Sequence, residues 1–149
     1  MRGRAQDPDS AVRVEAAPAT PDTLRGMLAT LDRDTLAEKR DAALLLLGYA
    51  CAARVSELAA LDRDDAVETE DGLLVSVYRR KLKRHDEVAV SCGSHPATCP
   101  VRAVRALLAA LDAEGRTAGM LFTTASGSRL DEPAVWGLLR SLARRAGLS

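Results

Sequence analysis

The sequence has few cysteines and no long hydrophobic run, and each shortage excludes a class of protein. Three cysteines, Cys51, Cys92 and Cys99, are too few and too odd in number for a disulfide framework. No apolar run approaches the roughly 20 residues that span a membrane. The longest, residues 42–47, is flanked by charged residues and predicts a buried helix. The amino terminus lacks the apolar stretch of a signal peptide, so we expect a cytoplasmic protein.

The chain also lacks net charge, because 21 lysines and arginines balance 21 aspartates and glutamates. This balance argues weakly against a nucleic-acid partner. The charges are segregated, however. An acidic block over residues 62–71 precedes a basic run over residues 79–85, in which only Leu82 cannot carry positive charge. Because a local basic face can contact phosphates even when the total charge is neutral, composition leaves the partner open.

The length of 149 residues suits a single domain with its own hydrophobic core. Residues 1–19 have no sustained apolar period and predict a flexible tail or linker, followed by a domain over residues 20–149. Thr20 and Pro21 predict the first helix start, with an N-cap hydroxyl and a proline at the first helical position.

Two further helices are expected before the basic run. One covers residues 35–52 and is apolar nearly all round, Tyr49 included, as in the centre of a core. The other is short, begins at residue 55 or 56, and turns Leu58 and Leu61 inward.

A hairpin follows, and its tip is the basic run. The acidic stretch ahead of it is expected to be a loop. Residues 73–79 are rich in β-formers, and residues 88–90 can return antiparallel to them. Later elements are a helix over residues 100–111, a short strand over residues 120–122, and a helix over residues 131–146 that stops at Gly147. We therefore predict an α+β fold, mostly helical, with helices around a small antiparallel β-hairpin or sheet.

The segment from Cys92 to Cys99 admits two interpretations. Its two cysteines and His95 are candidate metal ligands, but three ligands without an evident fourth make a poor structural zinc site. We favour a loop that leaves a strand, with Thr98 or Cys99 near a helix N-cap and Pro100 at the first helical position. We therefore expect no metal ion in this segment.

Arg54 stands at the start of the short third helix, about two dozen residues ahead of the basic run. An isolated arginine followed by a basic hairpin suggests a site for a phosphodiester. Plainer interpretations exist for both features. Arg54 could form a surface ion pair with Glu57, which would contribute little stability. The basic tip could be a solvated turn that discourages aggregation at a sheet edge.

The order of these elements resembles the catalytic domain of the tyrosine recombinases, or phage integrase family, over residues 20–149. Five stretches and the lysine-bearing hairpin carry the resemblance, and their order and spacing are more specific than any one of them. The stretches are residues 20–24, 40–49, 53–58, 93–103 and 121–148. The expected fold is therefore an incomplete tyrosine-recombinase catalytic fold.

The resemblance implies DNA integration and recombination by strand breakage and rejoining. In this family an active-site tyrosine attacks a DNA phosphodiester and forms a 3′-phosphotyrosyl link, without a metal or nucleotide cofactor. Two arginines hold the phosphate oxygens, and a hairpin lysine helps to protonate the leaving oxygen. The implied partner is double-stranded DNA. Intact members assemble as tetramers on DNA, whereas we expect this chain by itself to be monomeric.

Carried over by position, Arg54 matches the first arginine, and Glu57 an acidic residue that supports it. Lys81 best matches the hairpin lysine, with Lys83 as its competitor. The sequence departs from the family at Ala52, where a glycine is usual. The resemblance also implies DNA contacts from the other basic residues of the hairpin, which are Arg79, Arg80, Lys83 and Arg84.

The family's next element is a helix with a His-x-x-Arg box, and the nucleophilic tyrosine follows it. The sequence stops at Ser149, where that box should begin. Tyr49 and Tyr78 do not substitute, because we expect one in the apolar helix and the other on the first hairpin strand. The expectation is a DNA-binding part of a recombinase domain that does not cleave DNA alone. The alternative is a small helical protein-interaction domain with no nucleic-acid function.

Overall fold

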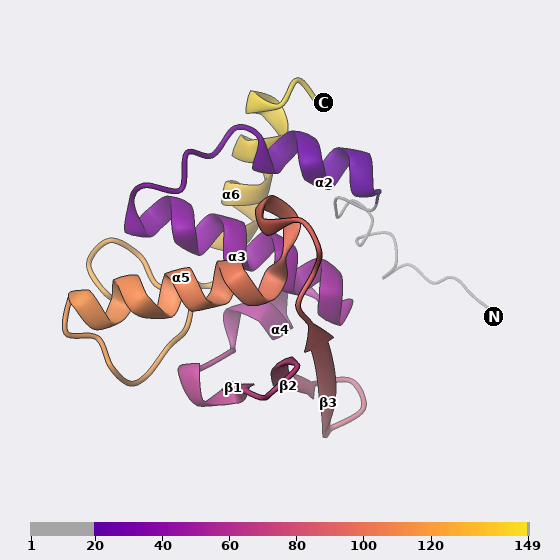
Figure 1. The fold of residues 1–149 in the computed structure, drawn as a ribbon, viewed down its shortest axis with the longest axis vertical. Coiled ribbons are helices and arrows are strands. Elements are labelled where there is room, and N and C mark those ends of the chain that lie inside the picture. Colours follow the sequence, from indigo (N-terminus) through magenta and orange to yellow (C-terminus); the bar gives the residue numbers. More distant parts are fainter. Residues whose placement is uncertain (1–19, 149) are drawn as a thin grey trace.

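The computed structural model describes residues 20–148, and the tail or linker predicted for residues 1–19 lies outside the described residues. The described chain folds into a group of helices with a three-stranded sheet at one end (Figure 1). Its elements are α2 (Pro21–Leu28), α3 (Leu36–Cys51), α4 (Val55–Ala59), a 3-10 turn (Arg63–Asp65), β1 (Ala66–Glu68), β2 (Gly72–Arg79), β3 (Arg84–Ser91), a second 3-10 turn (Pro96–Thr98), α5 (Pro100–Ala113) and α6 (Glu132–Arg145). The predicted α+β, mostly helical class is confirmed.

Side-chain caps set where the helices begin. The hydroxyl of Thr20 accepts the backbone N–H of Thr23 at the start of α2. At the start of α3, Thr35 and Glu38 each accept a backbone N–H from the other. Asp131 caps α6 with its carboxylate. These caps satisfy N–H groups that have no partner within the helix, and the predicted helix starts are confirmed.

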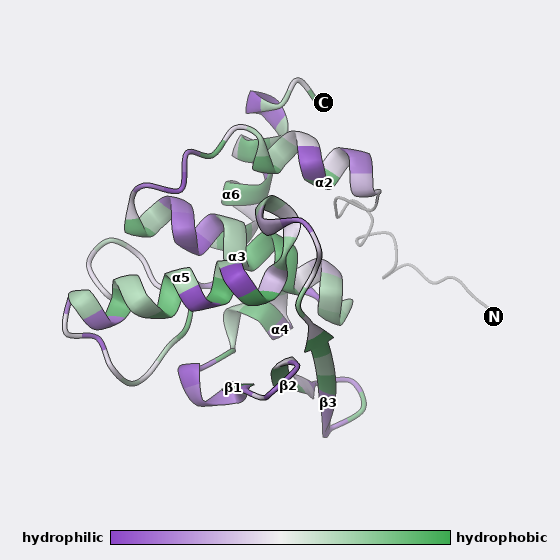
Figure 2. Ribbon diagram, viewed as in Figure 1, coloured by the Kyte–Doolittle hydropathy of each residue, from purple (hydrophilic) through white to green (hydrophobic). Residues whose placement is uncertain are grey.

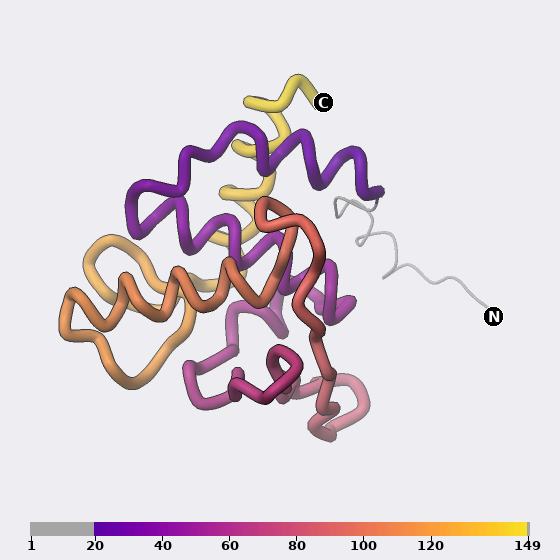
Figure 3. The backbone as a smooth tube through the Cα atoms, viewed as in Figure 1, coloured from indigo at the N-terminus to yellow at the C-terminus, as the bar shows by residue number. Residues whose placement is uncertain are grey.

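Helix α3 forms the centre of the core and packs against α2, α4 and α5 (Figure 3). Figure 2 shows apolar residues along α3 and α5, which lie side by side. Residues 42–47 are all buried, as the all-round apolar pattern predicts, and the charged Asp41 beside them is buried as well. The prediction is wrong for the last turn, where Tyr49 is 50% exposed while Cys51 turns back into the core. The neighbours that cover the middle of α3 therefore leave one side of its end open.

The sheet has the order β1-β2-β3, and both pairs are antiparallel. The predicted hairpin is confirmed, with Leu73 opposite Val90 and Arg79 opposite Arg84. Leu73, Val75 and Val77 face the core and are at most 1% exposed. The alternation of side chains along β2 thus fixes the register, because a slip by one residue would turn these apolar residues to solvent.

Two strand predictions are wrong. The expected acidic loop contains β1, a short edge strand. Its Val67 and Glu68 are both exposed, so the sequence shows no alternation of apolar and polar residues that would predict a strand. Conversely, the strand expected over residues 120–122 is an isolated bridge between Met120 and Asp62. Leu121 and Phe122 are buried there, so their apolar character reflects core packing rather than sheet pairing.

Within residues 20–148, no helix combines the length and the apolar character that crossing a membrane requires.

The start of β2 requires glycine. A Cβ atom on Gly72 would lie 2.1 Å from the carbonyl oxygen of Val90, a backbone atom of the paired strand. We expect Gly72→Ala to lower the free energy of unfolding by about 2 kcal/mol or more, measured by urea denaturation. Gly137→Ala in α6 is the control, since its nearest atom is 4.0 Å away. That variant should gain up to about 1 kcal/mol from helix propensity, and equal losses in both variants would contradict the prediction.

Candidate functional site

A tight turn between α3 and α4 presents Arg54. Ala52 ends α3 in the left-handed region, with φ of 50°, which explains why a glycine would suit this position. The next residues are extended, and Arg54 takes the N-cap position of α4. Its side chain is exposed, and its guanidinium has no hydrogen-bond or ion-pair partner within the described residues. The turn therefore leaves a charged fork available at the start of a helix.

Glu57 lies under this turn, with only 6% of its surface exposed. Its Oε1 atom accepts the backbone N–H of Arg54 at 2.8 Å. The same oxygen accepts Nη1 of Arg79, also at 2.8 Å. The suggested surface ion pair between Glu57 and the Arg54 side chain is not formed. Instead, one buried carboxylate joins the start of α4 to the end of β2.

The guanidinium of Arg79 donates to three partners inside the protein. Besides Glu57, Nε donates to Asp86 at 3.1 Å and Nη2 donates to the carbonyl oxygen of Cys51 at 3.1 Å. Burial lowers the pKa of Arg79, but its hydrogen bonds and charge interactions with Glu57 and Asp86 outweigh burial and raise it. Arg79 therefore stays charged and holds the hairpin against the end of α3.

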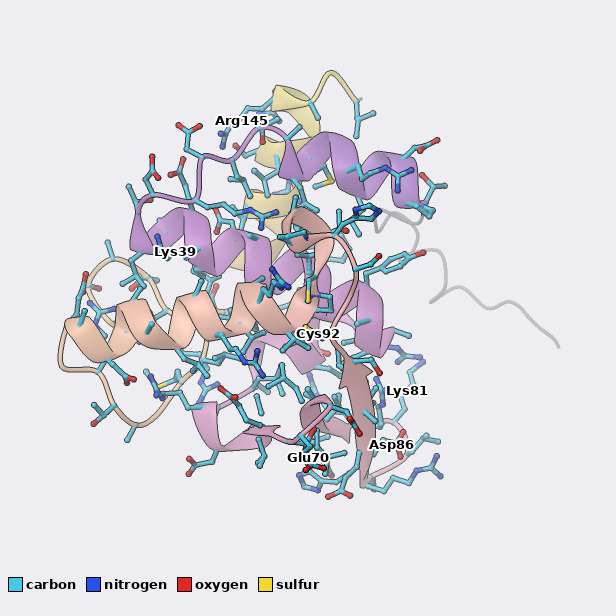
Figure 4. All side chains as sticks on the ribbon, viewed as in Figure 1. Lys39, Glu70, Lys81, Asp86, Cys92 and Arg145 are labelled. Carbon is cyan, nitrogen blue, oxygen red and sulfur yellow. The ribbon has the colours of Figure 1, made fainter. Side chains whose placement is uncertain are left out.

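The tip of the hairpin is a tight turn of exposed basic residues. Leu82 N–H donates to the Arg79 carbonyl and Lys83 N–H to the Arg80 carbonyl. Lys83 has a left-handed backbone, with φ of 53°. All four turn residues, Arg80, Lys81, Leu82 and Lys83, are exposed. Figure 4 shows Lys81 on this hairpin, far from the labelled Lys39 and Arg145 on the helices.

Asp86, the acid that directly follows the basic run, was missed by sequence reasoning. Its two carboxylate oxygens accept Nε of Arg84 at 2.9 Å and Nε of Arg79 at 3.1 Å. The hydrogen bond from Arg84, then that from Arg79, lowers the pKa of Asp86. Asp86 thus neutralises part of the charge at the base of the tip and orients both arginines.

The structure therefore divides the predicted site residues into two sets. Glu57 and Arg79 bind each other, and Nε, Nη1 and Nη2 of Arg79 each donate one hydrogen bond within the protein, so this predicted DNA-contact residue also holds the hairpin in place. The other predicted residues have exposed side chains on the α4 turn and the hairpin; they are Arg54, Arg80, Lys81, Lys83 and Arg84.

The predicted loop between β3 and α5 is confirmed. Cys99 is the N-cap of α5, its sulfur accepts the backbone N–H of Arg102, and Pro100 takes the first helical position. His85 and His95 are exposed. Over residues 20–148, no group of three or more His, Cys, Asp or Glu side chains is arranged to hold a metal ion.

The three contacts of Arg79 predict that lysine cannot replace it. A lysine ammonium keeps the charge but cannot reach three acceptors in the geometry of a planar fork. We expect Arg79→Lys to lower the free energy of unfolding by about 2 kcal/mol in urea denaturation. Arg84→Lys is the control, because the Arg84 side chain is 62% exposed, and it should change stability little. Similar losses for the two variants would refute the structural role of Arg79.

Comparison with known proteins bears on the family of this chain. No curated protein matches it. The family model described as "Phage integrase family" matches residues 19–149, which is most of the sequence. This match agrees with the resemblance found in the order of the sequence motifs. The chain belongs to the phage integrase family and contains a tyrosine-recombinase-type domain.

Proposed function

We propose that this chain binds double-stranded DNA through the exposed hairpin tip and the Arg54 turn, as a site-specific recombinase domain acting in DNA integration and recombination. The observation that carries the proposal is the shared carboxylate of Glu57. Its Oε1 atom accepts the backbone N–H of the exposed Arg54 and also Nη1 of Arg79, the residue from which the basic hairpin tip begins. Family membership supports DNA as the partner.

Within this proposal Arg54 is the phosphate ligand. A guanidinium presents its N–H donors in a plane that matches two phosphate oxygens. Glu57 fixes the backbone of Arg54 by accepting its N–H. The guanidinium of Arg54 has no partner in the described part of the chain. The side chain can therefore turn to a phosphate without breaking an existing ion pair.

Lys81 is the proposed hairpin lysine, and Lys83 is the competing residue. Both are exposed on the turn that Arg79 holds near α4. In the recombination reaction such a lysine would donate a proton to the leaving oxygen. Arg80 and Arg84 would add phosphate contacts along the same edge, which strengthens binding without reading the base sequence.

We also propose that these 149 residues do not cleave DNA by themselves. The sequence has no residue at a position that matches the family's second arginine or its nucleophilic tyrosine. Tyr49 lies on the last turn of α3, and Tyr78 lies on β2 with its ring 5.0 Å from that of His85. Loss of several members of a cooperating catalytic set removes nearly all activity.

DNA binding is tested by removing tip charges while sparing Arg79. We expect the triple variant Arg80→Ala, Lys83→Ala, Arg84→Ala to bind a labelled duplex more weakly in fluorescence anisotropy. The slope of log K against log salt should become shallower by about 2–3, since each lost phosphate contact contributes about 0.9. Arg25→Ala, Arg140→Ala, Arg144→Ala is the control, because it removes the same charge from exposed residues of α2 and α6. Equal binding by both variants would remove the hairpin from the DNA interface.

The proposed absence of DNA cleavage is tested with a nicked suicide duplex, which traps any covalent intermediate. We expect no protein–DNA adduct on a denaturing gel. Because Tyr49 is half exposed, Tyr49→Phe and Tyr78→Phe are run beside the natural sequence. An adduct that disappears in either variant would show a nucleophile within these residues and overturn the proposal of inactivity.

A further inference from the structure

The loop between β3 and α5 brings two thiols together. Sγ of Cys92 and Sγ of Cys99 lie 3.7 Å apart, although the two residues are seven positions apart in sequence. Figure 4 labels Cys92 beside the start of α5. A disulfide bond is about 2.05 Å long, so the sulfurs need to approach by roughly 1.6 Å. A rotation of the exposed Cys92 side chain can supply a movement of this size.

Cys99 is buried, with 0% of its surface exposed, and its sulfur accepts two backbone N–H groups. Gly93 donates at 3.1 Å, and Arg102, in the first turn of α5, donates at 3.5 Å. Burial raises the pKa of the Cys99 thiol, but the hydrogen bonds from Arg102, Gly93 and Cys92 outweigh burial and lower it. The lowered pKa favours the thiolate form of Cys99, which is the form that attacks disulfides.

Cys92, unlike Cys99, is exposed to solvent, so a disulfide in solution can reach its thiol. The backbone between the two residues keeps them close. A Cβ atom on Gly93 would lie 3.7 Å from both Cα and Cβ of Cys99, so this part of the loop already packs against Cys99. Arg33 also donates to the Ala97 carbonyl and ties the loop to the chain ahead of α3. An exposed thiol thus sits beside a buried, activated one.

We propose that Cys92 and Cys99 form a reversible disulfide by exchange with a low-molecular-weight disulfide such as oxidised glutathione. The Cys92 thiolate first attacks one glutathione sulfur, the glutathione S–S bond breaks, and the leaving thiolate takes up the proton lost by Cys92. The Cys99 thiolate then attacks Cys92 Sγ and releases the second glutathione, which takes up the proton lost by Cys99. Two protein thiols are oxidised, and one glutathione disulfide is reduced to two thiols.

Cys51 serves as an internal control. It is buried at the end of α3, and burial raises the pKa of its thiol to about 11, against a small lowering by Arg79. A protonated, buried thiol reacts slowly with disulfides. The reaction should therefore stay within the loop and leave Cys51 reduced.

The test is incubation of the full chain with oxidised glutathione at neutral pH, acid quenching, alkylation and mass spectrometry. No lysine or arginine lies between Cys92 and Cys99, so trypsin leaves both in the peptide of residues 85–102. We expect that peptide to lose about 2 Da, the mass of two hydrogen atoms, and to escape alkylation. Dithiothreitol should restore both alkylated cysteines.

Two variants separate the steps. Cys99→Ser keeps a favoured N-cap residue on α5 and should stop with one glutathione on Cys92. Cys92→Ser should leave Cys99 unmodified, because the exposed thiol is gone. Circular dichroism checks that both variants are folded. The proposal is overturned if the natural sequence also stops at the glutathione adduct, reacts at Cys51, or does not react under conditions that modify Cys99→Ser.

Discussion

The buried carboxylate of Glu57 is the interaction on which the arrangement of this site depends. A carboxylate taken out of water is costly unless hydrogen bonds and an opposite charge compensate it. Oε1 receives both, from the backbone of Arg54 and from the guanidinium of Arg79. Because the two donors belong to different elements, satisfying one side chain fixes the α4 turn relative to the hairpin.

The core supplies the frame for this contact. The buried middle of α3 fixes the end of the helix, where the Cys51 carbonyl accepts a third donor from Arg79. Ala52 then reverses the chain through a left-handed residue, which directs Arg54 outward while Leu58 returns to the core. The apolar face of β2 anchors the hairpin from the other side. The residues proposed to bind DNA are thus carried on exposed turns whose ends are held by buried contacts.

Local chemistry explains what could be predicted from the sequence. The caps at Thr20, Thr35 and Asp131 and the alternation along β2 are short-range signals, so the corresponding elements were found. Tyr49 was misplaced because its exposure depends on which neighbours reach the last turn of α3. The pairing of Glu57 with Arg79 was also missed. These residues are 22 positions apart, and only the packed hairpin shows that the neighbouring Arg54 contributes its backbone rather than its charge.

A double-mutant cycle between Glu57 and Arg79 tests the central claim most directly. Glu57→Ala, Arg79→Ala and the double variant are compared with the natural sequence by the free energy of unfolding in urea. If the shared carboxylate joins the hairpin to the α4 turn, the two single losses should exceed the loss in the double variant by about 1–3 kcal/mol. Losses that add to within about 0.5 kcal/mol would mean that the two residues act independently, and would contradict the account.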